Sequence, residues 1–499
     1  MRYRFKLRRA DLLFYLAACA FLIVHVWIVL KAGLSFPTPW PDEAHFLWQA
    51  HAFARHFTLF APQLNTERLI LWMPPGYFVL VGLFFKLVGS SLSSARFLSL
   101  LCMVPALIML LRFLARLTSR WWALAFWGFF IINARFIACS NIARMEALLL
   151  LIVTGGFLLI QNGRLTWGLS LLLFAPLVHF NGFLFLVFGV LYALYQLRNN
   201  GAVFSWSRWT LILSVLLVLA WVGYGLVAVS HWSAFMHDMA YQFGRKEEAR
   251  PWSFLTTSEN LLVLIILVVA GTYAARNKMK SFQLLFLGLP AWLTWRIGHE
   301  LWYEVIYHVG FLAASLLLLS VWVHLIKSWL GQNTGIKQVS SILIFIVLLV
   351  AWNFRLETIQ DMTKYPYCLH LQTMHYTGTV PYITDADKAR IMASIEKISG
   401  GRVLSVEFSP AADAFAMLPV SDDKIKYICP LFQRMVPDLV VAHYSRHLPA
   451  WWQYNDYMLA KAGVTRDSVS YIGLQRSGTE SWYVVPTSAE VRAKLHWQH

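Results

Sequence analysis

Two adjacent carboxylates near the start of the chain are the residues best suited to chemistry. Asp42 and Glu43 follow the first long apolar segment and stand directly behind Pro39 and Pro41, a pattern that predicts the start of a helix. A carboxylate at a membrane surface can act as a general base that takes a proton from a hydroxyl group. Acidic residues also stabilise the first turn of a helix. Both a catalytic and a capping role therefore fit this pair.

A second charged group lies between two apolar segments that a short loop joins. Arg135, Arg144 and Glu146 stand in the sequence ARFIACSNIARMEALLLL. Such residues can simply anchor helix ends among lipid headgroups, but ionisable residues at the ends of helices that line a bundle often mark a site. We therefore expect Arg144 and Glu146 to belong to the same site as the two carboxylates.

Histidines are concentrated in the segments predicted to face the outer side of the membrane, the side that also carries these carboxylates, and further cations lie there too. Any single histidine among them is expected to be a packing or interface residue. As a group they could hold a divalent metal, as could Asp42, Glu43 and Glu146, but no spacing in the sequence defines a ligand set. Arg296 and His308 could instead hold a phosphate at the membrane surface.

The composition is that of a membrane protein. Of the 499 residues 58% are hydrophobic and only 13% are charged, and the formal net charge is +17. The basic residues lie in short loops between apolar segments, where they set topology, so a nucleic-acid partner is not expected. The predicted environment is a lipid bilayer.

About eleven apolar segments are long enough, or nearly long enough, to span a bilayer. They cover approximately residues 12 to 32, 96 to 115, 121 to 138, 145 to 160, 165 to 178, 182 to 197, 209 to 229, 260 to 275, 282 to 297, 305 to 326 and 338 to 353. With the N-terminus in the cytoplasm, its own basic residues fall inside, as do Arg112, Arg116, Arg120, Arg164, Arg198, Arg208, Arg276, Lys278, Lys280, Lys327 and Lys337. Among the acidic residues before position 350, only Asp11 falls on that side.

An odd number of spans places the end of the chain outside the cytoplasm. The predicted fold is a polytopic α-helical membrane protein with a transmembrane catalytic domain at 1–355 and a C-terminal soluble α/β domain at 356–499. Strand-like runs such as RVLSVEF, DLVVAHY and SWYVVP support that domain. The segment 34–95 is expected to be an outer loop with interfacial helices. Cys368 and Cys429 could form a disulfide in the outer domain.

Several short motifs together resemble a known family, the GT-C fold glycosyltransferases that use polyprenyl-phosphate-linked sugars. The resemblance is to the branch that includes protein O-mannosyltransferases and the lipid A aminoarabinose transferase. The matching residues are Asp42-Glu43, Pro74-Pro75, Gly89 with Ala95-Arg96, Ala143-Arg144 with Glu146, His179 with Gly182, and Pro251-Trp252. They extend over roughly the first 310 residues.

The resemblance implies that Asp42 is the base, with Glu43 and Glu146 as orienting or metal-binding groups. Family members often have Asp at the position of Glu146 and a Lys beside the paired prolines, which here follow Met73 and precede Gly76. The phosphate-holding role then falls to one of three residues: Arg96, Arg296 or His308. Arg144 and His179 are further candidates for substrate binding.

The implied reaction transfers a sugar from a polyprenyl phosphate to a hydroxyl of a glycan, lipid or protein. One base is sufficient for an inverting displacement, and a cation that stabilises the leaving phosphate replaces a general acid. No cofactor is certain, although a divalent metal fits the carboxylates. The expected location is a bacterial inner membrane with the C-terminal domain in the periplasm.

Three other functions compete with this hypothesis. A transporter or flippase would place ionisable residues at mid-membrane, where His25 is the one strong candidate. A polysaccharide polymerase or ligase would use a polyprenyl-diphosphate carrier, and such enzymes tend to have a long outer loop late in the chain. A scaffold without enzymatic activity would use the outer domain to bind a partner.

Overall fold

The structure is a computed structural model of the whole chain. It describes residues 9–34, 41–133, 136–137, 140–247, 258–298, 304–329, 339–348, 385–401, 403–409, 415, 425–427, 437–445, 473–476 and 480–486. Arg135, Cys368 and Cys429 lie outside these residues, as does the Pro251-Trp252 motif, and so the proposed disulfide has no structural test.

Long apolar helices form the first part of the chain, because its sequence offers uninterrupted runs of residues that lipid can solvate. Five of the described helices are long and apolar enough to cross a membrane. They are α1 (Arg9–Ala32), α4 (Leu92–Leu117), α9 (Gly182–Asn200), α10 (Arg208–Ser230) and α15 (Glu304–Trp329). The predicted polytopic helical fold is therefore confirmed.

Shorter helices occupy most of the remaining predicted segments. They are α5 (Arg120–Ile131), α7 (Glu146–Gln161), α8 (Leu165–Val178), α12 (Ser258–Ile265), α13 (Gly271–Arg276), α14 (Leu285–Gly298) and a helix at 339–348. A π-helical turn, Ile266–Ala270, joins α12 to α13. Because several of these are shorter than a bilayer requires, the count of eleven spans stays a prediction.

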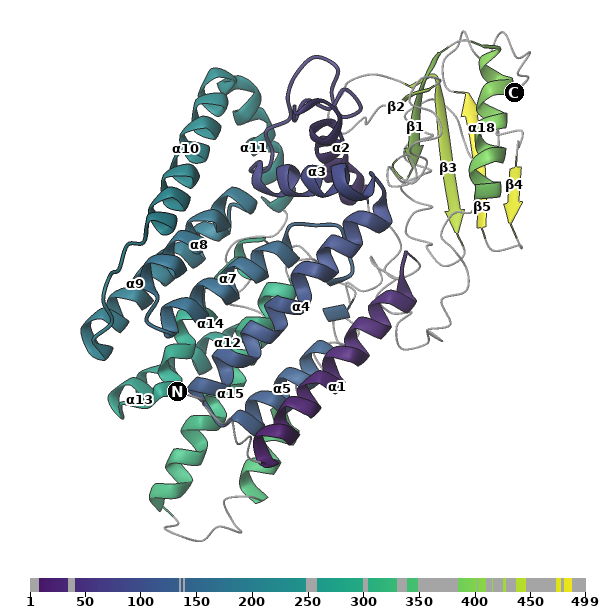
Figure 1. The fold of residues 1–499 in the computed structure, drawn as a ribbon. Helices are drawn as coiled ribbons and strands as arrows, with labels where there is room; N and C mark the ends of the chain where they lie inside the picture. The colour runs from purple at the N-terminus through teal and green to yellow at the C-terminus, as the bar shows by residue number, and fades with distance from the viewer. Residues whose placement is uncertain are drawn as a thin grey trace, which may run out of the picture.

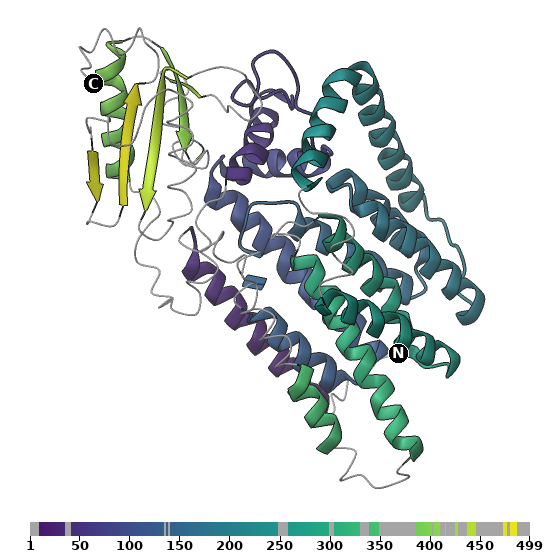
Figure 2. The ribbon, with the colours of Figure 1, turned by 180° about the vertical axis from the view of Figure 1, so that it is seen from behind.

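The helical body is held together by a continuous apolar core. On α4, Met103, Leu107, Leu110 and Leu114 are fully buried at the spacing that puts them on one face. This face packs against α7, which in turn packs against α8. Seen from behind (Figure 2), α14 and α15 lie across the earlier helices, and α15 packs against α5 and α7.

Two helices that follow α1 do not belong to the set of long spans. They are α2 (Pro41–His56) and α3 (Gly76–Val88), and they pack against each other. Helix α11 (Trp232–Glu247), in a segment that the sequence predicted as a loop, follows α10. In Figure 1, α2, α3, α11 and the C-terminal sheet all lie at the same end of the helical body.

The C-terminal part is a small α/β unit, as predicted. Its strands are β1 (Leu404–Ser409), β2 (Ile425–Tyr427), β3 (Leu439–Ser445), β4 (Gly473–Arg476) and β5 (Glu480–Pro486), in the order β2-β1-β3-β5-β4. Strand β1 pairs in parallel with β2 and β3, whereas β5 is antiparallel to β3 and β4. Helix α18 (Asp385–Ser399) packs against β4 and β5.

Aromatic side chains join this unit to α2. The ring centroid of Trp48 lies 5.2 Å from that of Phe415 and 5.6 Å from that of Tyr427 on β2. Phe415 also stacks on Phe85 of α3, with centroids 6.1 Å apart. All four side chains are buried, so the helix that begins with the two carboxylates is also the docking site of the C-terminal unit.

One tight turn brings α8 and α9 together. A Cβ atom at Gly182 would meet the carbonyl group of Ala175 and come within 2.5 Å of the backbone nitrogen of Pro176. Backbone atoms cannot move aside as a flexible side chain can. Gly182 is therefore required by the close approach of the two helices.

We predict that Gly182→Ala destabilises the protein, by about 1–3 kcal/mol or more, and lowers its melting temperature in detergent. Gly223→Ala on α10 is the matched control, because a Cβ there would meet no atom within 4 Å beyond the adjacent backbone of its own helix. Equal melting temperatures for the two variants would contradict the packing described for this turn.

Candidate active site

Asp42, the first of the two adjacent carboxylates, forms an ion pair with Arg144. Nη1 of Arg144 donates a hydrogen bond of 2.7 Å to Oδ2 of Asp42. The same guanidinium group donates to Glu146, with Nη2 at 3.2 Å and Nε at 3.3 Å from Oε1. Arg144 therefore bridges two carboxylates that are distant in sequence, at the start of α2 and the start of α7.

The second carboxylate forms a separate and more enclosed pair. Arg96 on α4 binds Glu43 in a bidentate manner, with Nε 2.9 Å from Oε1 and Nη2 2.8 Å from Oε2. The backbone N–H of Ala143 donates a further hydrogen bond of 2.7 Å to Oε1. Such fork-shaped pairs are strong and fix the orientation of both partners. Glu43 thus ties α2 to α4 and to the loop before α7.

The loop between α5 and α7 is fixed by several other hydrogen bonds. Ser99 on α4 donates to the carbonyl oxygen of Ile142 at 2.8 Å. The carbonyl oxygen of Gly33, at the end of α1, accepts from Arg96 at 3.1 Å and from Asn141 at 3.0 Å. The chain reversal that carries Arg144 is consequently anchored to α1, α2 and α4.

The three carboxylates differ in their access to solvent. The side chain of Asp42 is 12% exposed, whereas those of Glu43 and Glu146 are 0% and 2% exposed. A group that exchanges a proton with a substrate must be reachable from the substrate side. The geometry therefore favours Asp42 over the two glutamates as the reacting carboxylate.

Aromatic side chains, among them Phe46 and Trp72, pack beside this charged network. The guanidinium carbon of Arg144 stands 5.2 Å from the centroid of the Phe46 ring, a cation–π geometry. Phe46 stacks on Trp72 with centroids 5.0 Å apart. Nδ1 of His45, one turn along α2, is 3.8 Å from Oδ1 of Asp42. Aromatic packing on one side therefore limits where Arg144 and Asp42 can move.

Tyr77, in the first turn of α3, is a further polar residue near these groups. Burial, followed by the charges of Glu146 and Glu43, raises the pKa of its phenol well above the ordinary value. The phenol therefore keeps its proton and can donate a hydrogen bond. This hydroxyl is buried and, among the described residues, has no hydrogen-bond partner.

The other predicted site residues come from other elements. His179 is buried in the turn between α8 and α9, where its Nδ1 accepts a hydrogen bond of 3.0 Å from the backbone N–H of Asn181. His308 on α15 is buried near the rings of Phe130 and Phe136. Arg296 belongs to α14, and its side chain is outside the described part of the structure.

The predicted metal ligands do not present an open set of oxygens. Both oxygens of Glu43 and those of Glu146 accept hydrogen bonds from arginine. Within the described residues there is no group of three or more His, Cys, Asp or Glu side chains that could hold a metal ion. The three carboxylates thus do not fit a shared metal site in this arrangement, and the divalent metal stays a prediction.

Sequence reasoning missed the contacts that support the network. Phe46 and Trp72 stack on each other, but nothing in the sequence distinguishes them from the many other apolar residues. Arg68 and Asp238 form an ion pair although they are 170 positions apart. The sequence placed Asp238 on the outer side but offered no signal of its partner. Long-range pairing of this kind depends on how helices pack, which one sequence does not specify.

Comparison with protein-family models finds no match, and comparison with curated proteins finds none either. The chain is similar to the solved structure of ArnT from Cupriavidus metallidurans bound to undecaprenyl phosphate. That similarity has a TM-score of 0.46 and 11% identity, and it covers 95% of this chain and 98% of that chain.

It is also similar to the oligosaccharyltransferase AglB from Archaeoglobus fulgidus in complex with an inhibitory peptide and a dolichol-phosphate. This similarity has a TM-score of 0.40 and 12% identity over 95% of this chain and 74% of that chain. Both are GT-C glycosyltransferases, in agreement with the resemblance predicted from the sequence. At these scores the similarity does not define an activity, and the function proposed below rests on this chain's own residues.

We predict that Glu43→Gln strongly destabilises the protein, because it leaves the buried Arg96 without its counter-charge, at a cost of about 3–5 kcal/mol. Replacing both partners, as in Glu43→Leu with Arg96→Leu, is expected to recover part of that loss. Melting temperatures in detergent test this. Asp385→Asn is the control, because Asp385 pairs with Lys388 while its side chain is 99% exposed. A double variant less stable than Glu43→Gln would contradict the expectation.

Proposed function

We propose that this protein is a membrane glycosyltransferase that transfers a sugar from a polyprenyl-phosphate donor to an acceptor hydroxyl. One observation carries the proposal. A single carboxylate, Asp42, is partly open at the end of a helical bundle, while an arginine holds it in place. This arrangement supplies one oriented base beside a surface where a lipid-linked substrate would arrive.

In the proposed reaction Asp42 accepts the proton of the acceptor hydroxyl while that oxygen attacks the anomeric carbon. The bond between the anomeric carbon and the phosphate oxygen breaks, and the polyprenyl phosphate leaves with the electron pair. A direct displacement of this kind inverts the anomeric configuration. It needs no second carboxylate as nucleophile, in contrast to a retaining mechanism.

Arg144 and Glu146 support the base in this scheme. Arg144 binds Asp42 on one edge and Glu146 on another, so the position of the base is set from α7. Glu43 has a different role, because its carboxylate is fully buried and paired with Arg96. We propose that it holds the first turn of α2 in place and takes no part in proton transfer.

A cation must stabilise the charge that develops on the leaving phosphate. Arg96 is poorly suited, since leaving Glu43 would break a buried bidentate pair. Arg296 and His308 stay our proposals for this role. His179 lies in the α8–α9 turn with its Nδ1 already hydrogen-bonded, which favours a structural role.

The proposed location follows from the ends of the bundle. Helices α2, α3 and α11 lie at the same end of the helical body as the C-terminal sheet (Figure 1). We propose that this end faces the periplasm of a bacterial inner membrane, because the basic N-terminus and the basic residues Arg112, Arg116, Arg276 and Lys278 are predicted to lie on the other side. The acceptor is a glycan, lipid or protein.

We predict that Asp42→Asn lowers sugar transfer by about 10²–10⁴-fold without a matching loss of folded protein, because Asn is also a good residue at the start of a helix. The assay measures radiolabelled sugar transferred in membranes from a panel of polyprenyl-phosphate sugars. Asp11→Asn is the control, since Asp11 also pairs with an arginine, Arg120, but lies on α1.

Full transfer by Asp42→Asn would contradict the role of Asp42. Transfer only from a diphosphate-linked glycan would instead support the polymerase or ligase alternative. Inactivity of the intact protein with every lipid-linked donor would support a transporter or a scaffold.

A further inference from the structure

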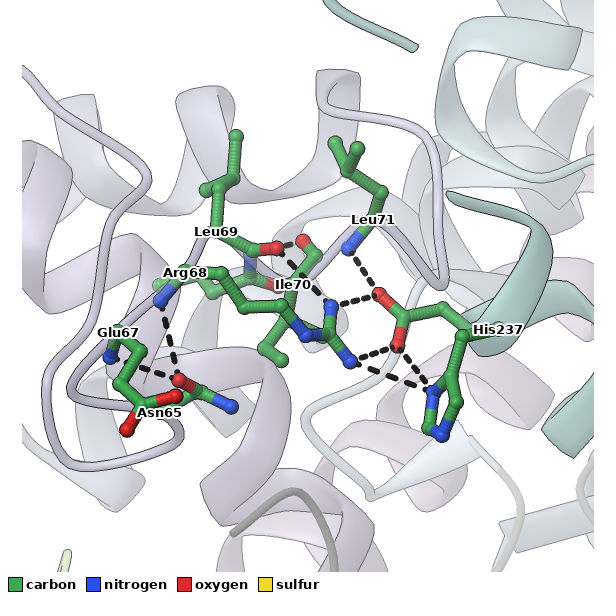
Figure 3. A network of polar contacts seen from close by, with 9 residues as sticks. Asn65, Glu67, Arg68, Leu69, Ile70, Leu71 and His237 are labelled. Carbon is green, nitrogen blue, oxygen red and sulfur yellow. Dashed lines mark hydrogen bonds and ion pairs between the residues drawn. The ribbon is translucent and has the colours of Figure 1, made fainter. Parts of the chain in front are cut away.

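A buried ion pair links α11 to the loop that precedes α3. Nη1 and Nη2 of Arg68 lie 2.9 Å and 2.6 Å from Oδ2 and Oδ1 of Asp238. Figure 3 shows the ring of His237 beside the Arg68 guanidinium group, with Nδ1 3.4 Å from Nη2. The side chain of Asp238 is only 1% exposed, whereas that of Arg68 is 24% exposed. We call this pair the Arg68–Asp238 clasp.

The clasp also fixes the backbone of the loop. Oδ2 of Asp238 accepts a hydrogen bond of 2.8 Å from the backbone N–H of Leu71 (Figure 3). The carboxylate thus holds the loop at two points, through the Arg68 side chain and through the main chain three residues later. An ion pair that only joined α11 to the Arg68 side chain would not need the hydrogen bond from the Leu71 N–H.

The same stretch is also hydrogen-bonded to α2. Nε2 of Gln49 donates a hydrogen bond of 2.9 Å to the carbonyl oxygen of Ile70. Gln49 is buried and lies two turns along the helix that begins with the proposed base. Residues 68–71 are therefore hydrogen-bonded to both α11 and α2, and their position depends on both helices.

Trp72 follows this stretch and reaches the proposed site. It is 1% exposed, its ring stacks on Phe46, and its centroid lies 5.9 Å from that of His45. Phe46 lies under the guanidinium group of Arg144, and His45 is next to Asp42. A continuous series of contacts thus runs from the clasp through Trp72 to the Arg144–Asp42 pair.

The burial of Asp238 stands out because its helix is otherwise largely exposed. Trp232 and Met236 on α11 are 56% and 46% exposed, and α10, which leads into it, is 11% buried in its most apolar window. A carboxylate is costly to bury. Among the described side chains of α11, at 232–240, that of Asp238 is the one classed as buried, and this placement beside the loop indicates a specific role there.

We propose that Arg68 and Asp238 are positioning residues of the transferase, which hold Trp72 against Phe46 and thereby fix Arg144 and Asp42. This proposal rests on the function proposed above. Neither residue touches the reacting atoms in this scheme. Their effect is on the geometry of the base, where a displacement of about 1 Å can lower the rate by 10²-fold.

The first test is kinetic and uses the full-length protein in membranes. We expect Arg68→Gln and Asp238→Asn each to lower kcat by about tenfold or more while the donor KM stays within about twofold. Arg68→Lys keeps the charge but loses the fork-shaped contact, so its kcat should lie between those of the wild type and Arg68→Gln. The double variant should be no worse than the poorer single variant, because both remove the same clasp.

Glu67→Gln is the matched control. Glu67 is an exposed carboxylate adjacent to Arg68 in sequence, and its loss should leave kcat unchanged. Additive effects of Arg68→Gln and Asp238→Asn, or kinetic losses that only follow the amount of folded protein, would overturn the proposal.

The second test does not depend on any activity. Hydrogen exchange of peptides from Asp238→Ala, which removes both carboxylate oxygens, should increase around Leu71, which loses its acceptor, and also in peptides covering 42–48 at the start of α2. Exchange that rises only around Leu71 would show a clasp without a connection to the site and would overturn the proposal. If the wild type transfers no sugar, the proposed function fails, but this exchange result still shows whether the contacts connect as described.

Discussion

The burial of charge at the first turn of α2 is the constraint on which the rest of this structure depends. Three carboxylates and two guanidinium groups lie together with side chains that are at most 12% exposed. Removing such groups from water costs several kcal/mol per ion unless each finds a partner with good geometry. Glu43 meets this requirement with Arg96 and the Ala143 N–H, and Asp42 and Glu146 meet it by sharing Arg144. Helices α2, α4 and α7 can therefore come together in only a few arrangements.

That arrangement separates two acidic residues that are adjacent in sequence. Successive residues on a helix point in directions about 100° apart, so Glu43 reaches Arg96 and the Ala143 N–H while Asp42 reaches Arg144. One becomes fully enclosed and serves to hold the helix. The other keeps a partly open side chain and can serve as a base. The stacked rings of Phe46 and Trp72 support Asp42. The Arg68–Asp238 clasp on α11 in turn supports these two rings.

Much of the architecture could be predicted from the sequence, because long apolar runs and alternating strands are local signals. The segment expected at 165–178 matches α8, and the run DLVVAHY covers all of β3 except its last residue. Asp42, Glu43, Arg96, Arg144 and Glu146 were all expected in the site, and the structure brings them together. Which arginine binds which glutamate could not be predicted, since this depends on the packing of distant helices. Helix α11 was missed because its polar residues resemble those of a solvated loop.

In the proposed reaction the acceptor oxygen displaces the phosphate in a single step with one oriented carboxylate as base, and the stereochemistry of the product tests this most directly. Purified protein would be supplied with a polyprenyl-phosphate sugar of known anomeric configuration, and the linkage formed would be determined by NMR. A single base predicts a product with the opposite configuration. A product that retains the configuration would require a covalent intermediate on a second nucleophile, and it would contradict the account given for Asp42 and Glu43.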